Sequence, residues 1–292
     1  MKIAVSSYSF QRLIREGQET QLSCIRLAKE LGYDGIEFTE LMPHDGSSPA
    51  EYAKKIAREC EKYGLPVTNY TVGADFLTGS GGILDAEVER VKAQVDIAQA
   101  LGTASMRHDA TTGFDSAARR QRGFAQALPR LAEGCRRITE YAAAKGIRTM
   151  IENHGFFCQD SARVEQLVNT VENPNFGLLL DMGNFLCADE APEHAFGVLA
   201  PYAFYLHAKD FHVKKGGYDP GKGFFQSRGG NYLRGAIIGH GDVPVRQCLA
   251  IMKRNGYDGY VGVEFEGIEE NRMALAYDLE NLKRMLESLP EA

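Results

Sequence analysis

The sequence predicts a single-domain (β/α)8 TIM barrel over residues 1–292. Three observations predict this fold. An amphipathic helix, a glycine and a short apolar strand recur in that order along the chain, and strands that alternate with helices form parallel sheets. Eight such strands can be counted, which is the number that closes a barrel. The chain also lacks a glycine-rich strand-to-helix loop, the mark of the doubly wound alternative.

The first four strands are predicted from short apolar runs and from the glycines before them. The chain opens on an apolar run, so a strand precedes the first helix. Gly32, Gly64 and Gly102 each follow a helical stretch. Glycine suits the left-handed position just past a helix end, so each marks the joint before the next strand. Strands are therefore expected at residues 3–5, 35–38, 67–71 and 104–107.

The last four strands follow by the same reasoning. Gly146 and Gly256 mark the joints before the fifth and eighth strands, and Gly-Tyr-Asp-Gly occurs at both 32–35 and 256–259. Two apolar runs between these joints supply the sixth and seventh strands. Strands are expected at residues 149–152, 178–181, 205–207 and 260–264.

Composition restricts the functional class. The net charge is -6 and the Lys and Arg residues are scattered, which argues against a nucleic-acid partner. The six cysteines show no CxxC or other close pairing, so we expect reduced, buried thiols rather than a zinc knuckle or disulfides. No apolar signal-peptide region or membrane-length run is present, so we expect a cytoplasmic protein without a membrane partner. The sequence leaves a homo-oligomer open.

Four apolar strands end on residues that bind divalent metals. These residues are Glu152, Asp181, His207 and Glu264. An apolar strand normally ends in turn-forming residues, so packing alone does not explain metal-binding residues at these strand ends. Side chains alternate along a strand, so Glu152 shares a face with Met150, Asp181 with Leu179 and His207 with Tyr205. All four could point inward at the barrel mouth, where barrel enzymes carry their chemistry.

Each of these residues has an ordinary alternative reading. A single strand-end Glu is usually a solvated loop residue, and a lone His is more often structural than a ligand. Together, however, three carboxylates and one imidazole from four strands form a ligand set for one divalent ion. The oxygen-rich set favours Mn²⁺ or Mg²⁺, with Co²⁺ or Zn²⁺ as alternatives, and we expect Mn²⁺ first.

Four segments resemble the signature segments of the xylose-isomerase-like TIM barrels, the sugar phosphate isomerases and epimerases. The segments are Ile151-Glu-Asn-His154, Leu180-Asp-Met-Gly-Asn184, Leu206-His-Ala-Lys-Asp210 and Gly256-Tyr-Asp-Gly-Tyr-Val-Gly-Val-Glu264. The resemblance implies that Glu152, Asp181, His207 and Glu264 bind one divalent metal and that the two glutamates are the acid/base catalysts. Asn184 stands where ketose 3-epimerases carry a histidine. The dehydratase-like members of the family also tend to carry an asparagine there.

The chemistry of these residues suits proton removal beside a carbonyl. A divalent ion can polarise the carbonyl and a carboxylate can remove the proton. The function expected first is a metal-dependent isomerase or epimerase of a sugar or sugar derivative. A lyase acting on a keto-sugar or keto-inositol could use the same groups, and a sugar-binding barrel without catalysis is a third class. The apurinic endonucleases of the same superfold need more histidines and a basic face for DNA, so they fit the chain poorly.

Seven further residues are expected to contact a small sugar or polyol substrate: Glu37, His108, His154, Asn184, Lys209, His240 and Glu266. Most follow a predicted strand end by zero to two residues, where they could touch substrate or support a metal ligand. Each could equally be a solvated loop or surface group, since loop carboxylates and structural histidines are common.

The segment 212–242 is expected to be a long loop insertion that closes over the substrate. It is rich in glycine and carries basic residues, and a loop of this length in a compact barrel is either functional or disordered. A lid is favoured because loops carry function on rigid scaffolds, and His240 would then lie at the pocket. A mobile insertion without a catalytic part is the alternative.

Overall fold

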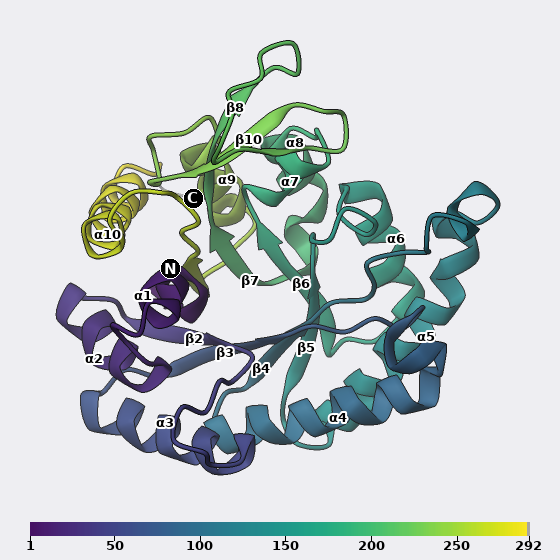
Figure 1. The fold of residues 1–292 in the computed structure, drawn as a ribbon, viewed down its shortest axis with the longest axis horizontal. Helices are drawn as coiled ribbons and strands as arrows, with labels where there is room; N and C mark the ends of the chain where they lie inside the picture. The colour runs from purple at the N-terminus through teal and green to yellow at the C-terminus, as the bar shows by residue number, and fades with distance from the viewer. Residues whose placement is uncertain (291–292) are drawn as a thin grey trace.

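The computed structural model describes residues 1–290 and shows eight parallel strands closed into a barrel (Figure 1). Around the barrel the strand order is β1-β11-β7-β6-β5-β4-β3-β2, so the first and last strands of the chain are neighbours. All eight predicted strands are confirmed to within two residues. They are β1 (Lys2–Ser6), β2 (Gly35–Thr39), β3 (Val67–Val72), β4 (Ser105–His108), β5 (Arg148–Glu152), β6 (Phe176–Asp181), β7 (Ala203–Ala208) and β11 (Tyr260–Val263).

Helices surround the barrel on the outside (Figure 1). The five glycines expected at helix ends, 32, 64, 102, 146 and 256, all have positive φ, as the left-handed C-cap requires. The helices are α1 (Gln11–Arg15), α2 (Gln21–Leu31), α3 (Pro49–Tyr63), α4 (Leu84–Leu101), α5 (Phe124–Ala143), α6 (Ser161–Val171), α7 (Asn184–Cys187), α8 (Pro192–Leu199), α9 (Val245–Arg254) and α10 (Asn271–Glu287).

The inside of the barrel is packed in layers, and one layer sets the floor of the site. Met150, Leu179 and Tyr205 form a small buried cluster of their own, separate from the large core between sheet and helices. These residues lie two positions before Glu152, Asp181 and His207, so the predicted alternation is confirmed. On β11, a Cβ atom at Gly262 would lie 3.1 Å from the His207 ring, so a larger residue there would crowd that ring.

The segment 212–242 differs from its prediction as a long loop. It contains most of a three-stranded antiparallel sheet of β8 (Asp210–Lys214), β10 (Tyr232–Ala236) and β9 (Phe225–Gln226), which projects from the barrel beside β7 (Figure 1). The backbone N–H groups of Gly239, Gly241 and Val243 all donate to the Asp210 carboxylate, which ties the return of this segment to the end of β7. The segment is therefore an ordered sheet with a short glycine-rich tip.

The remaining expectations concern the cysteines and the membrane. All six cysteines are buried and unpaired, as their spacing predicted. Within residues 1–290, no helix combines the length and apolar character needed to span a bilayer.

Candidate metal centre

Four side chains meet at the C-terminal mouth of the barrel. Glu152 is the last residue of β5, Asp181 the last of β6, His207 lies on β7, and Glu264 directly follows β11. One possible ligand atom from each residue lies within 4.8 Å of those of the other three. All four residues are buried. The parallel strands end at the same edge of the barrel, and this brings together residues that are up to 112 positions apart.

The two nitrogens of His207 have different surroundings. Nε2 lies 2.9 Å from Oε1 of Glu37, whereas Nδ1 faces Asp181 and Glu264 at 3.7 Å and Glu152 at 3.9 Å. Burial disfavours a charged ring, but the carboxylates of Glu37 and Glu264 raise the pKa of His207 well above its ordinary value. Nδ1 therefore points into a space whose other walls are acidic.

The chemistry of this space fits a divalent cation. Among the described residues, His207 Nδ1 and Asp181 Oδ2 are buried without a hydrogen-bond partner. Buried polar atoms are rarely left without a hydrogen bond, and these two lie 3.7 Å apart, where one bound cation could contact both. One imidazole nitrogen and three carboxylates are a donor set suited to Mn²⁺, Mg²⁺ or Zn²⁺.

Glu37 lies behind His207 rather than facing a substrate. It is 0% exposed, and it accepts a hydrogen bond from Asn69 Nδ2 at 2.9 Å in addition to its contact with His207. Burial would raise the pKa of Glu37, but His207 and the hydrogen bonds lower it. The expected contact with a sugar hydroxyl does not fit this depth in the barrel. The position instead suits orientation of the imidazole, a common arrangement behind metal-bound histidines.

Glu152 is held by an arginine and an amide. Arg107 Nη2 lies 2.9 Å from Oε2, and Asn184 Nδ2 donates to Oε1 at 2.8 Å. Although burial opposes ionisation, Arg107 and His207 hold the pKa of Glu152 well below its usual range. Asn184 also donates its backbone N–H to Asp181 Oδ1 at 2.8 Å, so it positions two of the four carboxylates.

Glu264 has a different environment. Burial raises the pKa of Glu264, against the opposing effect of Lys209, whose Nζ lies 2.5 Å from Oε2. Lys209 also lies 3.4 Å from Asp181 Oδ2 and 3.4 Å from Glu266 Oε1. Despite its burial, Asp181 and Glu264 raise the pKa of Lys209 well above its usual value, so it stays charged. The two glutamates therefore differ in their readiness to take up a proton.

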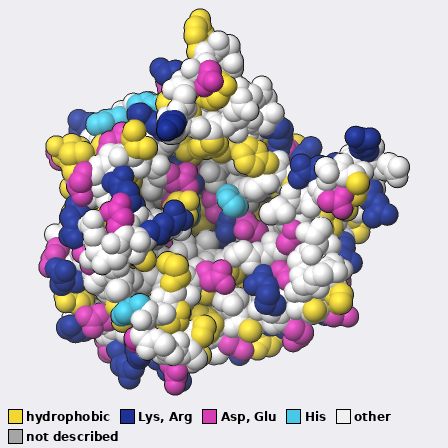
Figure 2. Space-filling view, in the orientation of Figure 1, with side chains coloured by type: hydrophobic (Ala, Val, Ile, Leu, Met, Phe, Trp, Pro, Cys, Tyr) yellow, Lys and Arg dark blue, Asp and Glu magenta, His cyan; other side chains and the backbone are white. Residues whose placement is uncertain are grey.

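A cavity of about 200 Å³, here called the inner pocket, opens onto this cluster. His154 stands at its mouth with its side chain half exposed, and Nδ1 lies 3.0 Å from Asp109 Oδ1. Figure 2 shows the barrel mouth hollowed, with acidic, basic and histidine side chains inside. The residues lining the inner pocket are Tyr8, Thr39, Glu40, Thr71, Val72, Gly73, Arg107, Glu152, His154, Lys209, Glu264 and Glu266.

Two predicted substrate contacts lie elsewhere. His108 is fully buried and packs edge-on against Phe76 with ring centroids 5.7 Å apart, and burial lowers its pKa to about 4. Its neighbour Arg107 takes the inward position on β4, because adjacent strand residues face opposite sides. His240 is exposed on a turn whose Gly239 contacts α10, so it does not line the inner pocket. Both expectations are corrected by these positions.

Other residues of the site had little or no signal in the sequence. Asp109 follows β4 and binds Arg107 at 2.7 Å, and Tyr8 lies in a short 3-10 turn after β1. Arg107 is a charged residue near the end of a predicted strand, but its ion pair with Glu152 could not be read from the sequence. Inward parity on β4 could have identified Arg107, whereas the loop residues depend on how the chain turns after each strand.

The family model described as xylose isomerase-like TIM barrel matches residues 25–285. A solved D-tagatose 3-epimerase-like protein is similar at a TM-score of 0.73 and 19% identity, covering 98% of this chain and 97% of its own. The probable 3-DHS dehydratase AsbF from Bacillus anthracis gives 0.72 and 18%, covering 97% and 99%. The IolI protein with a bound zinc atom gives 0.75 and 14%, covering 100% of both chains. The curated proteins contain no match.

Proposed function

Because the chain belongs to the xylose isomerase-like TIM barrel family, we propose that it is a divalent-metal-dependent isomerase or epimerase of a sugar or sugar derivative. The observation that carries this proposal is the buried cluster of Glu152, Asp181, His207 and Glu264, in which two polar atoms lack a partner among the described residues. The cation would be Mn²⁺ first, with Mg²⁺, Co²⁺ or Zn²⁺ as alternatives. When bound, it would polarise the substrate carbonyl and stabilise negative charge on its oxygen.

The proton transfers are assigned to Glu152 and Glu264. Their pKa values are pushed in opposite directions, since Arg107 favours the ionised form of Glu152 and burial favours the protonated form of Glu264. Such divergence is typical of acid/base pairs. In an epimerisation one carboxylate would remove the proton beside the carbonyl and the other carboxylic acid would return a proton to the opposite face.

Lys209, His154, Asn184 and Glu266 would support this chemistry. Lys209 holds Glu264 by its ammonium group, and Asn184 holds Glu152 by its amide. His154 and Glu266 line the inner pocket, where they can hydrogen-bond to substrate hydroxyls. The pocket volume of about 200 Å³ suits the reacting end of a small sugar or polyol.

A lyase reaction is the second candidate, favoured by Asn184 beside Glu152 and by the buried ammonium of Lys209. Elimination of water removes one proton beside the carbonyl and expels a hydroxyl group from the next carbon. A carboxylate would take the proton, and a second protonated group would donate one to the leaving hydroxyl, so that water departs and a conjugated carbonyl forms. The structural similarity to a probable dehydratase is compatible with this outcome but shows the fold alone.

Incubation in D₂O tests the proposal. The Mn²⁺-loaded protein should introduce deuterium beside the carbonyl of at least one compound in a panel of ketoses, keto-sugars and inososes. Glu152→Gln and Glu264→Gln, each shown to bind Mn²⁺, should lower this exchange by about 100-fold or more. An isomerase returns a product of the same mass apart from deuterium, whereas a lyase creates ultraviolet absorbance. Absence of both exchange and elimination across the panel would contradict the proposed catalysis.

A further inference from the structure

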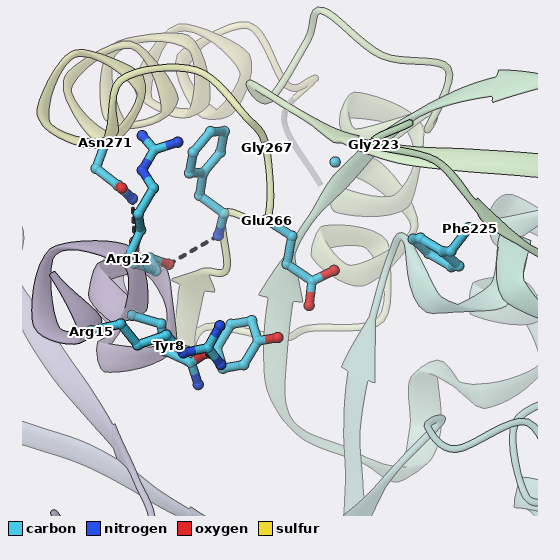
Figure 3. Close-up of a pocket in the computed structure, with 12 residues that line it drawn as sticks. Tyr8, Arg12, Arg15, Gly223, Phe225, Glu266, Gly267 and Asn271 are labelled. Atoms are coloured by element: carbon cyan, nitrogen blue, oxygen red, sulfur yellow. Dashed lines mark hydrogen bonds between the residues drawn. The ribbon is translucent and has the colours of Figure 1, made fainter. Parts of the chain in front are cut away.

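A second cavity adjoins the inner pocket and is not used by the chemistry above. It has a volume of about 300 Å³ and shares Tyr8 and Glu266 with the inner pocket, so these two side chains form the partition (Figure 3). We call it the outer compartment. Its walls include Tyr8, Arg12, Arg15, Phe225, Gly235 and Glu266.

The sizes of the two cavities indicate a substrate with two parts. Ligand sites usually measure about 300–1,000 Å³, and the inner pocket alone, at about 200 Å³, lies below that range. The two cavities together fall inside it. In Figure 3 the Glu266 carboxylate and the Tyr8 hydroxyl point toward one another, and Phe225 lies across the cavity from them. A substrate whose carbonyl lies at the cluster could therefore extend past this pair.

The lining of the outer compartment has a surplus of positive charge, which the lining of the inner pocket lacks. Two arginines line it, and within residues 1–290 neither Arg12 nor Arg15 forms an ion pair with a carboxylate. Glu266 is the acidic residue of its lining, and Lys209 lies 3.4 Å away on the side of the cluster. The surplus in the outer compartment is therefore positive, which suits an anionic ligand group.

Arg12 and Arg15 differ in their hydrogen-bond partners. Arg12 Nη1 donates to the carbonyl of Ile268 at 3.0 Å and Nη2 to that of Glu269, so its guanidinium holds the segment that carries Glu266. Arg15 donates one N–H to Gln11 Oε1 at 2.5 Å and is otherwise exposed. A guanidinium carries five N–H donors in a planar fork that matches carboxylate and phosphate oxygens. Arg15 is thus the residue free to bind an anion.

The projecting sheet supplies the far wall. Phe225 of β9 is 39% exposed, and Gly235 of β10 forms a bridge to Gly267, close enough that any side chain there would meet the backbone of Glu266. The sheet that was expected to be a lid is therefore fixed against the segment after β11. It closes the outer compartment on the side opposite α1, and the Phe225 side chain lines the cavity there.

We propose that the substrate carries an anionic oxygen group, a phosphate or a carboxylate, at the end remote from its reacting carbonyl, and that Arg15 binds this group in the outer compartment. This inference rests on the proposed function for the placement of the carbonyl. An uncharged second sugar ring beside Phe225 would also fill the space, but it would make no use of the positive charge that Arg15 brings to the lining.

Three ketoses that differ only at carbon 6 test the inference: D-fructose, D-fructose 6-phosphate and D-fructuronate. Their dissociation constants are measured by calorimetry on the Mn²⁺-loaded protein, without any need for turnover. At least one anionic ketose should bind about 10-fold or more tightly than D-fructose, since charge-assisted bidentate bonds are among the stronger polar contacts. The preferred anion then distinguishes phosphate from carboxylate.

Arg15→Gln is the diagnostic variant. It should reduce the preference for the anionic ketose to about 3-fold or less while leaving the affinity for D-fructose unchanged. Arg58→Gln is the matched control, because Arg58 is exposed on α3 outside the barrel. Equal affinity for all three ketoses, or a preference that survives Arg15→Gln, would overturn the inference.

The outcomes separate this inference from the proposed reaction. An Arg15-dependent preference in a protein that exchanges no deuterium would leave the anion site standing and remove the proposed catalysis. Turnover of neutral ketoses without any anion preference would support the proposed catalysis and overturn the anion site. Tighter binding of a neutral disaccharide than of either anionic ketose would replace the anion with an uncharged second ring.

Discussion

Asp181 is the residue on which metal binding can be tested most directly. Its Oδ2 is buried, has no hydrogen-bond partner among the described residues, and belongs to the cluster of four ligand-type side chains, so we expect it to bind the metal ion. Asp181→Ala should therefore lower the metal content of protein purified without chelators from about one ion to a small fraction of that. Elemental analysis measures this, with Asp219→Ala on the exposed sheet tip as the control. Equal metal content in both variants would contradict the site.

Glu37 should tune the metal affinity without touching the ion. Its carboxylate faces His207 Nε2 at 2.9 Å and so directs the other ring nitrogen toward the carboxylates. Glu37→Gln should weaken Mn²⁺ binding by about 10- to 100-fold, the usual effect of losing such a partner. Calorimetric titration of Mn²⁺ gives the affinity, and Glu61→Gln on the surface of α3 is the control. An unchanged affinity would reduce Glu37 to a packing residue.

For single residues, the sequence predicted the face of a strand on which a side chain lies better than it predicted how deeply that side chain is buried. The period of two along a strand placed Glu152, Asp181 and His207 on the inner face, and the structure brings them together. The same period gave Glu37 the correct face, but its burial depends on the stagger between neighbouring strands, which no local pattern reports. His108 was misplaced by one position, which on a strand reverses the side that a residue faces.

The contribution of the projecting sheet to substrate binding can be tested by shortening it. Gly216 lies against Gly230, so Asn-Gly in place of residues 217–229 could close the β8–β10 hairpin with a short turn. This change removes Phe225, and with it a wall of the outer compartment, but leaves Asp210 and the 239–243 turn intact. The variant should keep its circular dichroism spectrum and melting temperature to within a few degrees while KM rises by about 10-fold or more.

An unchanged KM in the folded hairpin variant would show that the sheet takes no part in substrate binding. The control is a variant with Tyr218→Ser alone, because Tyr218 is 74% exposed at the tip and lines neither cavity. Loss of the folded barrel in the shortened variant would instead show that the sheet stabilises the barrel mouth, contrary to the expectation that it is an independent addition.

The elements differ in how far the sequence could predict them. Five of the eight barrel strands, β2, β3, β4, β5 and β11, follow a glycine at a helix end, so local signals mark their start, and the other three are marked by their apolar runs. The strands β8 and β10 lack such markers, and their pairing joins Lys214 to Tyr232 across a glycine-rich stretch. Their sheet depends on antiparallel contacts between segments that each resemble a loop in sequence, so the sequence predicted a long loop there.

Asp278 makes the stability of the whole molecule depend on pH. It lies on α10, accepts the N–H of Ile238 at 2.7 Å, and burial raises its pKa to about 8. The folded chain therefore binds a proton here that the unfolded chain has released above its ordinary pKa. Stability should fall as pH rises from about 4 to about 8 and level off above that, by an amount on the order of 5 kcal/mol at most.

Asp278→Asn should remove most of this dependence. Asparagine keeps an oxygen to accept the Ile238 N–H and carries no charge to desolvate, so the variant should exceed the wild type in stability at pH 8.5, tested by urea unfolding, by about 1–3 kcal/mol. Glu280→Gln, exposed on the same helix, is the control and should change little. A wild-type advantage at pH 8.5 would mean that the carboxylate is ionised and stabilised in the fold.

The pairing of β1 with β11 has a consequence for synthesis on the ribosome. Lys2 pairs with Tyr260, so β1 gains one of its two neighbours in the barrel only when β11 emerges from the ribosome. At about 5–20 residues per second, that edge of β1 waits roughly 10 to 50 s. Throughout this time the nascent barrel is an open sheet with two free edges, a template for pairing with other chains. Demand for chaperone protection should therefore peak late in translation and end abruptly on closure.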